Sequence, residues 1–227
     1  MDEIDFKELA RQRARLLAEA AAAEGKYLEW FERLYREADR DEKQIPWADL
    51  EPNRFFVKWA ESVGLCGAGQ KALVVGCGLG DDARYLRNLG FAVTAFDISP
   101  TAIEWAKKLD SDTEIRFEVM NLFNPFRDWL HAFDFVLEVY TIQPLQSQLR
   151  EQAIDAIADF VAPGGKLAVV TRGRSDDDDS DAFPLPLSRR ELQRFVESGL
   201  AEEEFRVMQG DEDPPIPRFV AIYRRPN

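Results

Sequence analysis

The chain has 227 residues, of which 45% are hydrophobic, and its formal net charge is -13. This length fits one α/β domain with an N-terminal extension or two small domains, and the apolar fraction suffices for a sizeable core. The acidic balance disfavours nucleic-acid substrates and docking on anionic membranes, because both attract basic surfaces.

The few cysteines and histidines narrow the chemistry further. Cys66, Cys77 and His131 are the complete set, which is too few for a disulfide framework or a zinc-ligand pattern. The N-terminal segment lacks the apolar run of a signal peptide, and no 18-residue apolar stretch occurs. We therefore expect a cytoplasmic protein without a metal, a nucleic-acid partner or a membrane partner, either a monomer or a homodimer.

The first third of the chain is predicted to be helical, with one loop. Residues 6–35 carry leucines at helical spacing and an alanine run, which favour one helix. Residues 39–53 read as a loop interrupted by Pro46 and Pro52, and residues 55–63 as a short apolar helix.

From residue 71 onward, short apolar runs alternate with helical patterns. We expect seven strands, at residues 72–75, 92–96, 115–119, 133–139, 166–171, 204–208 and 218–223. Helices are expected over residues 82–89, from Ser99-Pro100, and over residues 149–161 and 188–198, where Ser99 and Ser188 serve as N-caps. Alternation of this kind predicts an α/β fold with a mostly parallel sheet covered on both faces.

The segment Gly76-Cys77-Gly78-Leu79-Gly80-Asp81 lies between the first predicted strand and a helix. Glycines there permit a tight turn and the close approach of a ligand. In a dinucleotide fingerprint Asp81 would be a glycine, and a carboxylate at the helix N-terminus repels a pyrophosphate. S-adenosylmethionine (SAM) carries no phosphate and is cationic at its sulfonium and ammonium, so the departure favours SAM over NAD.

Polar residues follow the next strands at the edge where ligands bind in such sheets. Asp97, about twenty residues past the glycines, is placed to accept hydrogen bonds from both ribose hydroxyls, or else only starts the turn before Ser99. Asn121 would bond the adenine amino group, with Leu122 or Phe123 against the ring, or else Asn121-Leu122 would only shape a loop. Glu138 and Tyr140 end the fourth strand, beside the expected position of the transferable methyl group.

These motifs resemble those of the class I SAM-dependent methyltransferases over roughly residues 71–225. The glycine segment resembles their first motif and Asp97 their ribose-binding acid, while Asn121-Leu122 stands where the family usually has Asp-Leu. Phe133-Asp134-Phe135-Val136 resembles the fourth motif. The resemblance implies a Rossmann-like three-layer sandwich with a seven-stranded, mostly parallel sheet whose last strand is antiparallel.

The N-terminal part is similar to the thiopurine and halide/thiol methyltransferase group, and more loosely to tellurite-resistance methyltransferases. The similar residues are Trp30, Tyr35 and Ile45-Pro46-Trp47. The resemblance implies that residues 1–66 form a helical arm that covers the cofactor and lines the acceptor site, and residues 67–227 the SAM-binding domain. Alternatively, Trp30 and Trp47 are plain core residues.

We expect a methyltransferase that uses SAM to methylate a small-molecule acceptor such as a thiol, a halide or another small nucleophile. Tyr140 and Trp47 are the candidate catalytic residues. The candidate cofactor-binding residues are Trp30, Trp47, Gly76, Cys77, Gly78, Asp97, Ile98, Asn121, Leu122 and Glu138. The alternatives are a SAM-binding protein that acts on a protein or has no turnover, and an NAD-dependent oxidoreductase, which Asp81 disfavours.

Overall fold

A computed structural model describes residues 6–110, 114–178, 185–212 and 214–227. Its centre is an eight-stranded sheet in the order β3-β2-β1-β4-β5-β8-β7, with β6 paired to β5. The strands are β1 (Lys71–Val75), β2 (Ala92–Asp97), β3 (Arg116–Val119), β4 (Phe133–Val139), β5 (Val161–Arg174), β6 (Leu187–Ser188), β7 (Ala201–Gln209) and β8 (Pro217–Arg224). All seven predicted strands are present.

The last strand runs against its neighbours, as expected. β1 to β5 pair in parallel, whereas β8 is antiparallel to both β5 and β7. The two-residue β6 was not predicted, because it has no apolar run of its own and pairs only with the end of β5. β5 begins at Val161 rather than at residue 166, since Val161 pairs with Phe133 before the register shifts.

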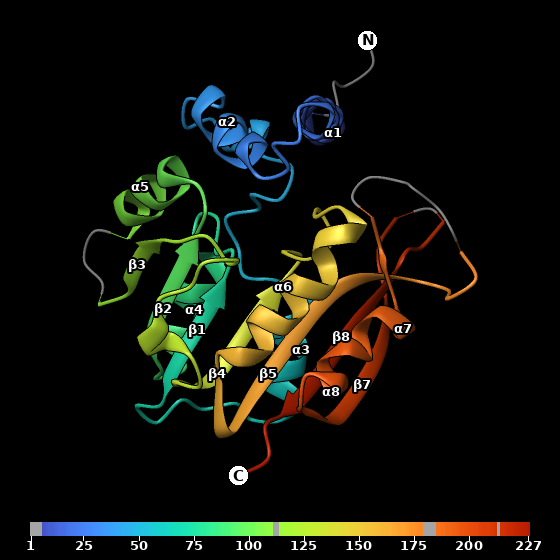
Figure 1. Ribbon diagram of the computed structural model, residues 1–227. Coiled ribbons are helices and arrows are strands. Elements are labelled where there is room, and N and C mark those ends of the chain that lie inside the picture. The colour runs from blue at the N-terminus through green and yellow to red at the C-terminus, as the bar shows by residue number, and fades with distance from the viewer. Residues whose placement is uncertain (1–5, 111–113, 179–184, 213) are drawn as a thin grey trace.

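Helices cover both faces of the sheet and give the predicted three-layer sandwich (Figure 1). The helices are α1 (Phe6–Ala23), α2 (Glu29–Glu37), α3 (Arg54–Ser62), α4 (Asp81–Asn88), α5 (Pro100–Leu109), α6 (Ser147–Asp159), α7 (Arg189–Leu192) and α8 (Arg194–Glu197), with 3-10 turns η1 (Glu42–Gln44) and η2 (Arg127–Trp129). α6, α7 and α8 pack on one face, and α3, α4 and α5 on the other. None of the described helices is long and apolar enough to cross a membrane.

Two predicted helices are interrupted. The expected helix over residues 6–35 ends at Ala23, because Gly25 adopts a left-handed φ of 71° and Lys26 N bonds back to Ala21 O at 2.8 Å. The expected helix over residues 188–198 consists of α7 and α8, which meet at Gln193. Ser99 and Ser188 do cap their helices, as predicted.

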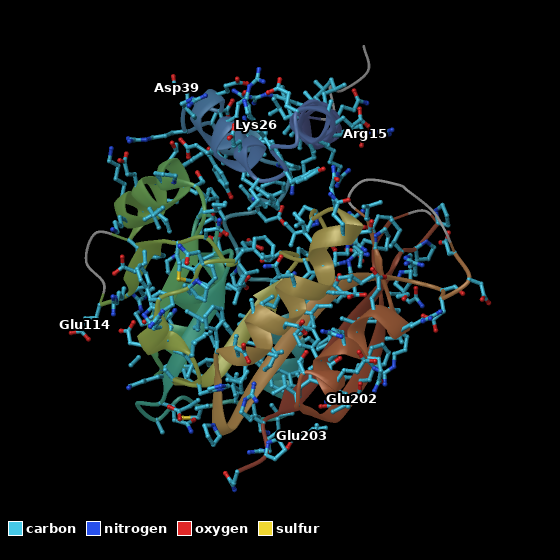
Figure 2. The ribbon with its side chains drawn as sticks, viewed as in Figure 1. Arg15, Lys26, Asp39, Glu114, Glu202 and Glu203 are labelled. Carbon is cyan, nitrogen blue, oxygen red and sulfur yellow. The ribbon has the colours of Figure 1, made fainter. Side chains whose placement is uncertain are left out.

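The segment before α3 forms an arm on one edge of the sheet. α1 and α2 lie together at the top of Figure 1, and α2 packs on α5. Their apolar side chains, including Leu17, Trp30 and Leu34, form a third cluster with Trp105 of α5. The exposed residues Arg15, Lys26 and Asp39 lie at the outer surface of the arm (Figure 2). α3 packs instead against the sheet.

Candidate functional site

The glycine loop follows β1 and is shaped for close approach. Gly76, Gly78 and Gly80 have φ values of 57°, 51° and 85°, which residues with a side chain adopt only at a cost. A Cβ on Gly76 would lie 2.5 Å from Thr141 Oγ1, and one on Gly78 would lie 2.9 Å from the Tyr35 hydroxyl. The glycines therefore let Thr141 and Tyr35 pack directly on the loop, which lies at the carboxyl end of β1, the edge where ligands bind in parallel sheets.

Asp97 joins this loop to the end of β2. Its side chain is 7% exposed; Oδ2 accepts a hydrogen bond from Gly78 N at 3.0 Å and Oδ1 one from Ser99 N at 2.9 Å. Burial raises the pKa of this carboxyl, and the backbone N–H donors oppose that rise. Each carboxylate oxygen has two lone pairs, so both can accept one more bond from a ligand hydroxyl.

Glu138 is the second buried acid at this edge. Its Oε1 accepts from Thr141 N at 2.7 Å and from Ile142 N at 3.0 Å, whereas Oε2 has no partner among the described residues. The side chain is fully buried, and desolvation raises its pKa to about 7. Thr141 Oγ1 donates to Val75 O at 3.0 Å, which places this turn beside the glycine loop. An unpartnered buried oxygen is rare and points to a ligand.

The arm closes over the glycine loop through two aromatic side chains. Trp47 Nε1 donates to the Tyr35 hydroxyl at 2.7 Å, and that hydroxyl is the group that excludes a Cβ at Gly78. Trp30 meets Trp47 edge-on, with ring centroids 6.1 Å apart. Burial, with the nearby charge of Asp97 second, raises the pKa of Tyr35. The neutral phenol thus stays a hydrogen-bond partner for Trp47.

Glu32 fastens the arm to α5. Its Oε2 accepts from Ser99 Oγ at 2.6 Å and from Thr101 N at 3.2 Å, and its Oε1 accepts from Thr101 Oγ1 at 2.7 Å. Burial acts to raise the pKa of Glu32, but the hydrogen bonds outweigh it and the pKa is lowered. No sequence motif predicts this contact, since Glu32 lies far from Ser99 and Thr101 in the chain.

Comparison with known proteins agrees with this geometry. Residues 73–169 match the family model of a methyltransferase domain. Over these residues the chain is therefore similar to methyltransferase domains. It is 27% identical over 154 residues to a 2-heptyl-1-hydroxyquinolin-4(1H)-one methyltransferase of Mycobacteroides abscessus, covering 66% of each chain.

Two further similarities concern a curated relative and a solved structure. A ubiquinone biosynthesis O-methyltransferase of Xanthomonas axonopodis pv. citri is 30% identical over 139 residues, which are 60% of this chain and 56% of the relative. The chain thus spans less than two thirds of the length of these curated relatives. The N-methyltransferase NodS from Bradyrhizobium japonicum WM9, solved with S-adenosyl-L-homocysteine (SAH), shares the fold with a TM-score of 0.64 at 21% identity, covering 86% of this chain and 99% of NodS.

The predicted adenine contacts lie at the end of β3. Asn121 is exposed and its Oδ1 accepts from Phe123 N at 2.9 Å, so the side chain also shapes its own turn. Leu122 is buried in the core, and Ile98 is half-buried directly after Asp97. Met120 N donates to Asp97 O at 3.0 Å, so the ends of β2 and β3 lie side by side.

Tyr140 and Gln143 are anchored to strand ends. The Tyr140 hydroxyl accepts from Arg218 Nε at 2.9 Å, and its backbone has an unusual φ of 57°. Gln143 Oε1 accepts from Thr171 Oγ1 at 3.2 Å and from Arg172 N at 3.0 Å. The sequence predicted that Tyr140 ends β4, but gave no signal of the arginines that surround it.

The remaining polar candidates lie away from the site or serve the fold. His131 is exposed at the start of β4, where its N donates to Asp159 O at 2.7 Å. Asp82 accepts from Asn53 N at 2.7 Å, and burial raises its pKa to about 6. Burial raises the pKa of the Cys77 thiol as well, which agrees with packing rather than nucleophilic attack.

Proposed function

We propose that this chain binds SAM between the arm and the sheet and transfers its methyl group to a small aromatic acceptor. The observation that carries the proposal is the Asp97 carboxylate, which bonds Gly78 N at 3.0 Å and so fixes the acid and the glycine loop as one cradle. SAM supplies a methyl group already activated by its sulfonium. The chain has only to bind, align and exclude water.

Asp97 would hold the ribose hydroxyls with its remaining lone pairs, and the bare loop at Gly76, Cys77 and Gly78 would accommodate the rest of the cofactor. Ile98, Asn121 and Leu122 would contact the adenosine end. These roles rest on the way the ends of β1, β2 and β3 converge, and on the buried Asp97 carboxylate that faces the loop.

Glu138 would face the cationic part of the cofactor. Its Oε2 is buried without a partner among the described residues, and burial raises its pKa to about 7. A cation bound nearby stabilises the carboxylate. Trp47, held by Tyr35, and Trp30 would close the site with their rings, which attract cations.

Two classes of methyl acceptor are suggested by different similarities. The similarity of the arm to the thiopurine and halide/thiol group favours a thiol or a halide, whereas the relatives named above act on a hydroxyquinolone and in ubiquinone biosynthesis. Tyr140, at the end of β4, would contact the acceptor in either case. We favour an aromatic acceptor because Tyr140 packs within an apolar cluster that includes Phe55.

The test is SAH formation with purified protein and SAM, using matched phenols and thiophenols together with 2-heptyl-1-hydroxyquinolin-4(1H)-one. We expect turnover with at least one ring acceptor and loss of turnover in Asp97→Ala. Asp134→Ala removes an acid that bonds Lys71 N at the opposite end of the strands and should retain activity. SAM binding without turnover of any acceptor would contradict the enzymatic role.

A further inference from the structure

Two arginines stand side by side where β5 and β8 meet the site. Arg172, near the end of β5, pairs in register with Arg218, at the start of β8. Paired residues of an antiparallel ladder project to the same face, so the guanidinium groups are neighbours. Arg218 is 6% exposed, and the Arg172 side chain is 18% exposed. Two neighbouring buried cations are unfavourable unless an anion lies between them.

The carboxylate of Glu212 lies against both arginines and partly offsets their positive charge. Glu212 Oε1 lies 3.3 Å from Arg172 Nη2 and is also paired with Arg218. It is the only carboxylate in contact with either guanidinium within the described ranges, which omit residues 179–184 and 213. The other oxygen, Oε2, is buried without a described partner. Because both arginines share the one oxygen Oε1, most of their guanidinium N–H groups make no bond to Glu212.

The guanidinium groups of the two arginines differ in how many contacts they make within the protein. Arg218 donates through Nη1 to Ile216 O at 2.7 Å and through Nε to the Tyr140 hydroxyl at 2.9 Å, so it is held on three sides. Arg172 has one guanidinium contact in the described structure, to Glu212. Burial, with the neighbouring charge of Arg218 second, lowers the pKa of Arg172. Arg172 is thus the more exposed and less engaged cation.

We infer that Arg172, backed by Arg218, binds the carboxylate of an aromatic acid that is the methyl acceptor. This inference rests on the proposed function. The two guanidiniums already hold the carboxylate of Glu212, which shows that the pair suits a carboxylate. The apolar ring surface beside them comes from Tyr140 and Phe55, over which the Arg218 guanidinium lies 6.0 and 5.6 Å from the ring centroids.

The strand order brings an aromatic side chain and the cation together. β4 and β5 are adjacent, so their ends lie about 5 Å apart. Tyr140 follows β4, and Arg172 is near the end of β5. An aromatic ring that packs on Tyr140 can therefore present a carboxylate to Arg172 on the neighbouring strand. The inferred substrate class is therefore a hydroxy- or mercapto-arene carboxylic acid.

The test measures binding, so that it does not depend on turnover. SAH-loaded protein is titrated calorimetrically with 2-, 3- and 4-hydroxybenzoate and with the three matching hydroxybenzamides. We expect at least one acid to bind roughly 10- to 100-fold more tightly than its amide, the range for a charge-assisted hydrogen bond. Arg172→Gln should abolish this preference.

Arg174→Gln is the matched control. Arg174 lies on the same strand with a side chain 19% exposed, but it bonds Pro186 O and Glu191. It should leave the acid preference unchanged. Equal binding of acids and amides, no binding of any acid, or an equal loss in both variants would overturn the inference. If the wild type does not bind SAH, the proposed function fails, and the same titrations of the unloaded protein still decide the arginine site.

Discussion

Replacing Glu138 by Gln tests whether the buried acid is destabilising when ionised. Its pKa in the folded protein is about 7, against 4.5 for the ordinary carboxyl. An acid with a raised pKa contributes stability that is fully present below about pH 4.5 and is lost as the pH rises through about 7. The difference between the two pKa values corresponds to about 3 kcal/mol of unfolding free energy.

Gln is neutral at every pH and can still accept the two backbone bonds from Thr141 and Ile142. The assay is urea unfolding of the wild type and Glu138→Gln in parallel from pH 5 to pH 8.5. Pairing the two proteins cancels the other titrating groups, including Asp82 with its pKa of about 6. We expect the unfolding free energy of Glu138→Gln, relative to that of the wild type, to rise by about 2–3 kcal/mol from pH 5 to pH 8.5. A stability difference that is flat across this range would refute the reasoning.

Two further variants test the arm and the glycine loop. Trp47→Ala removes the ring that Tyr35 orients, so turnover should fall about tenfold while the SAM dissociation constant rises by less than about fivefold; unchanged turnover would rule out a lid. Gly78→Ala places a Cβ 2.9 Å from the Tyr35 hydroxyl and should abolish measurable SAM binding in calorimetry, whereas Gly64→Ala, with φ of 61° and open space around it, should bind normally. Equal SAM affinity in the two glycine variants would contradict the cradle.

Local sequence patterns were sufficient to predict the main strands of the sheet and the starts of two helices. Short apolar runs located the seven main strands. Ser99 and Ser188 marked helix starts, because a side-chain oxygen satisfies the free N–H groups there. The position of Asp97 at the same edge as the glycine loop was predicted, because ligand-binding edges in parallel sheets collect the residues that follow the strands, whereas its hydrogen bond from Gly78 N was not.

Contacts between distant segments were not predictable in the same way. Glu32 reaches Ser99 because α2 packs on α5, which depends on how the whole arm docks. Arg172 and Arg218 become neighbours only through the β5–β8 register. The break at Gly25 was hidden by the strong helix propensity of the alanines before it, since a left-handed residue after a helix depends on the chain reversal that follows.

The central claim is that Asp97 and the glycine loop form a SAM site. The most direct measurement is calorimetric titration of the wild type with SAM and with NAD in parallel, repeated for Asp97→Ala and Asp134→Ala. Micromolar SAM binding without NAD binding, lost in Asp97→Ala and kept in Asp134→Ala, is the predicted result. NAD binding in place of SAM, or unchanged SAM affinity in Asp97→Ala, would contradict it.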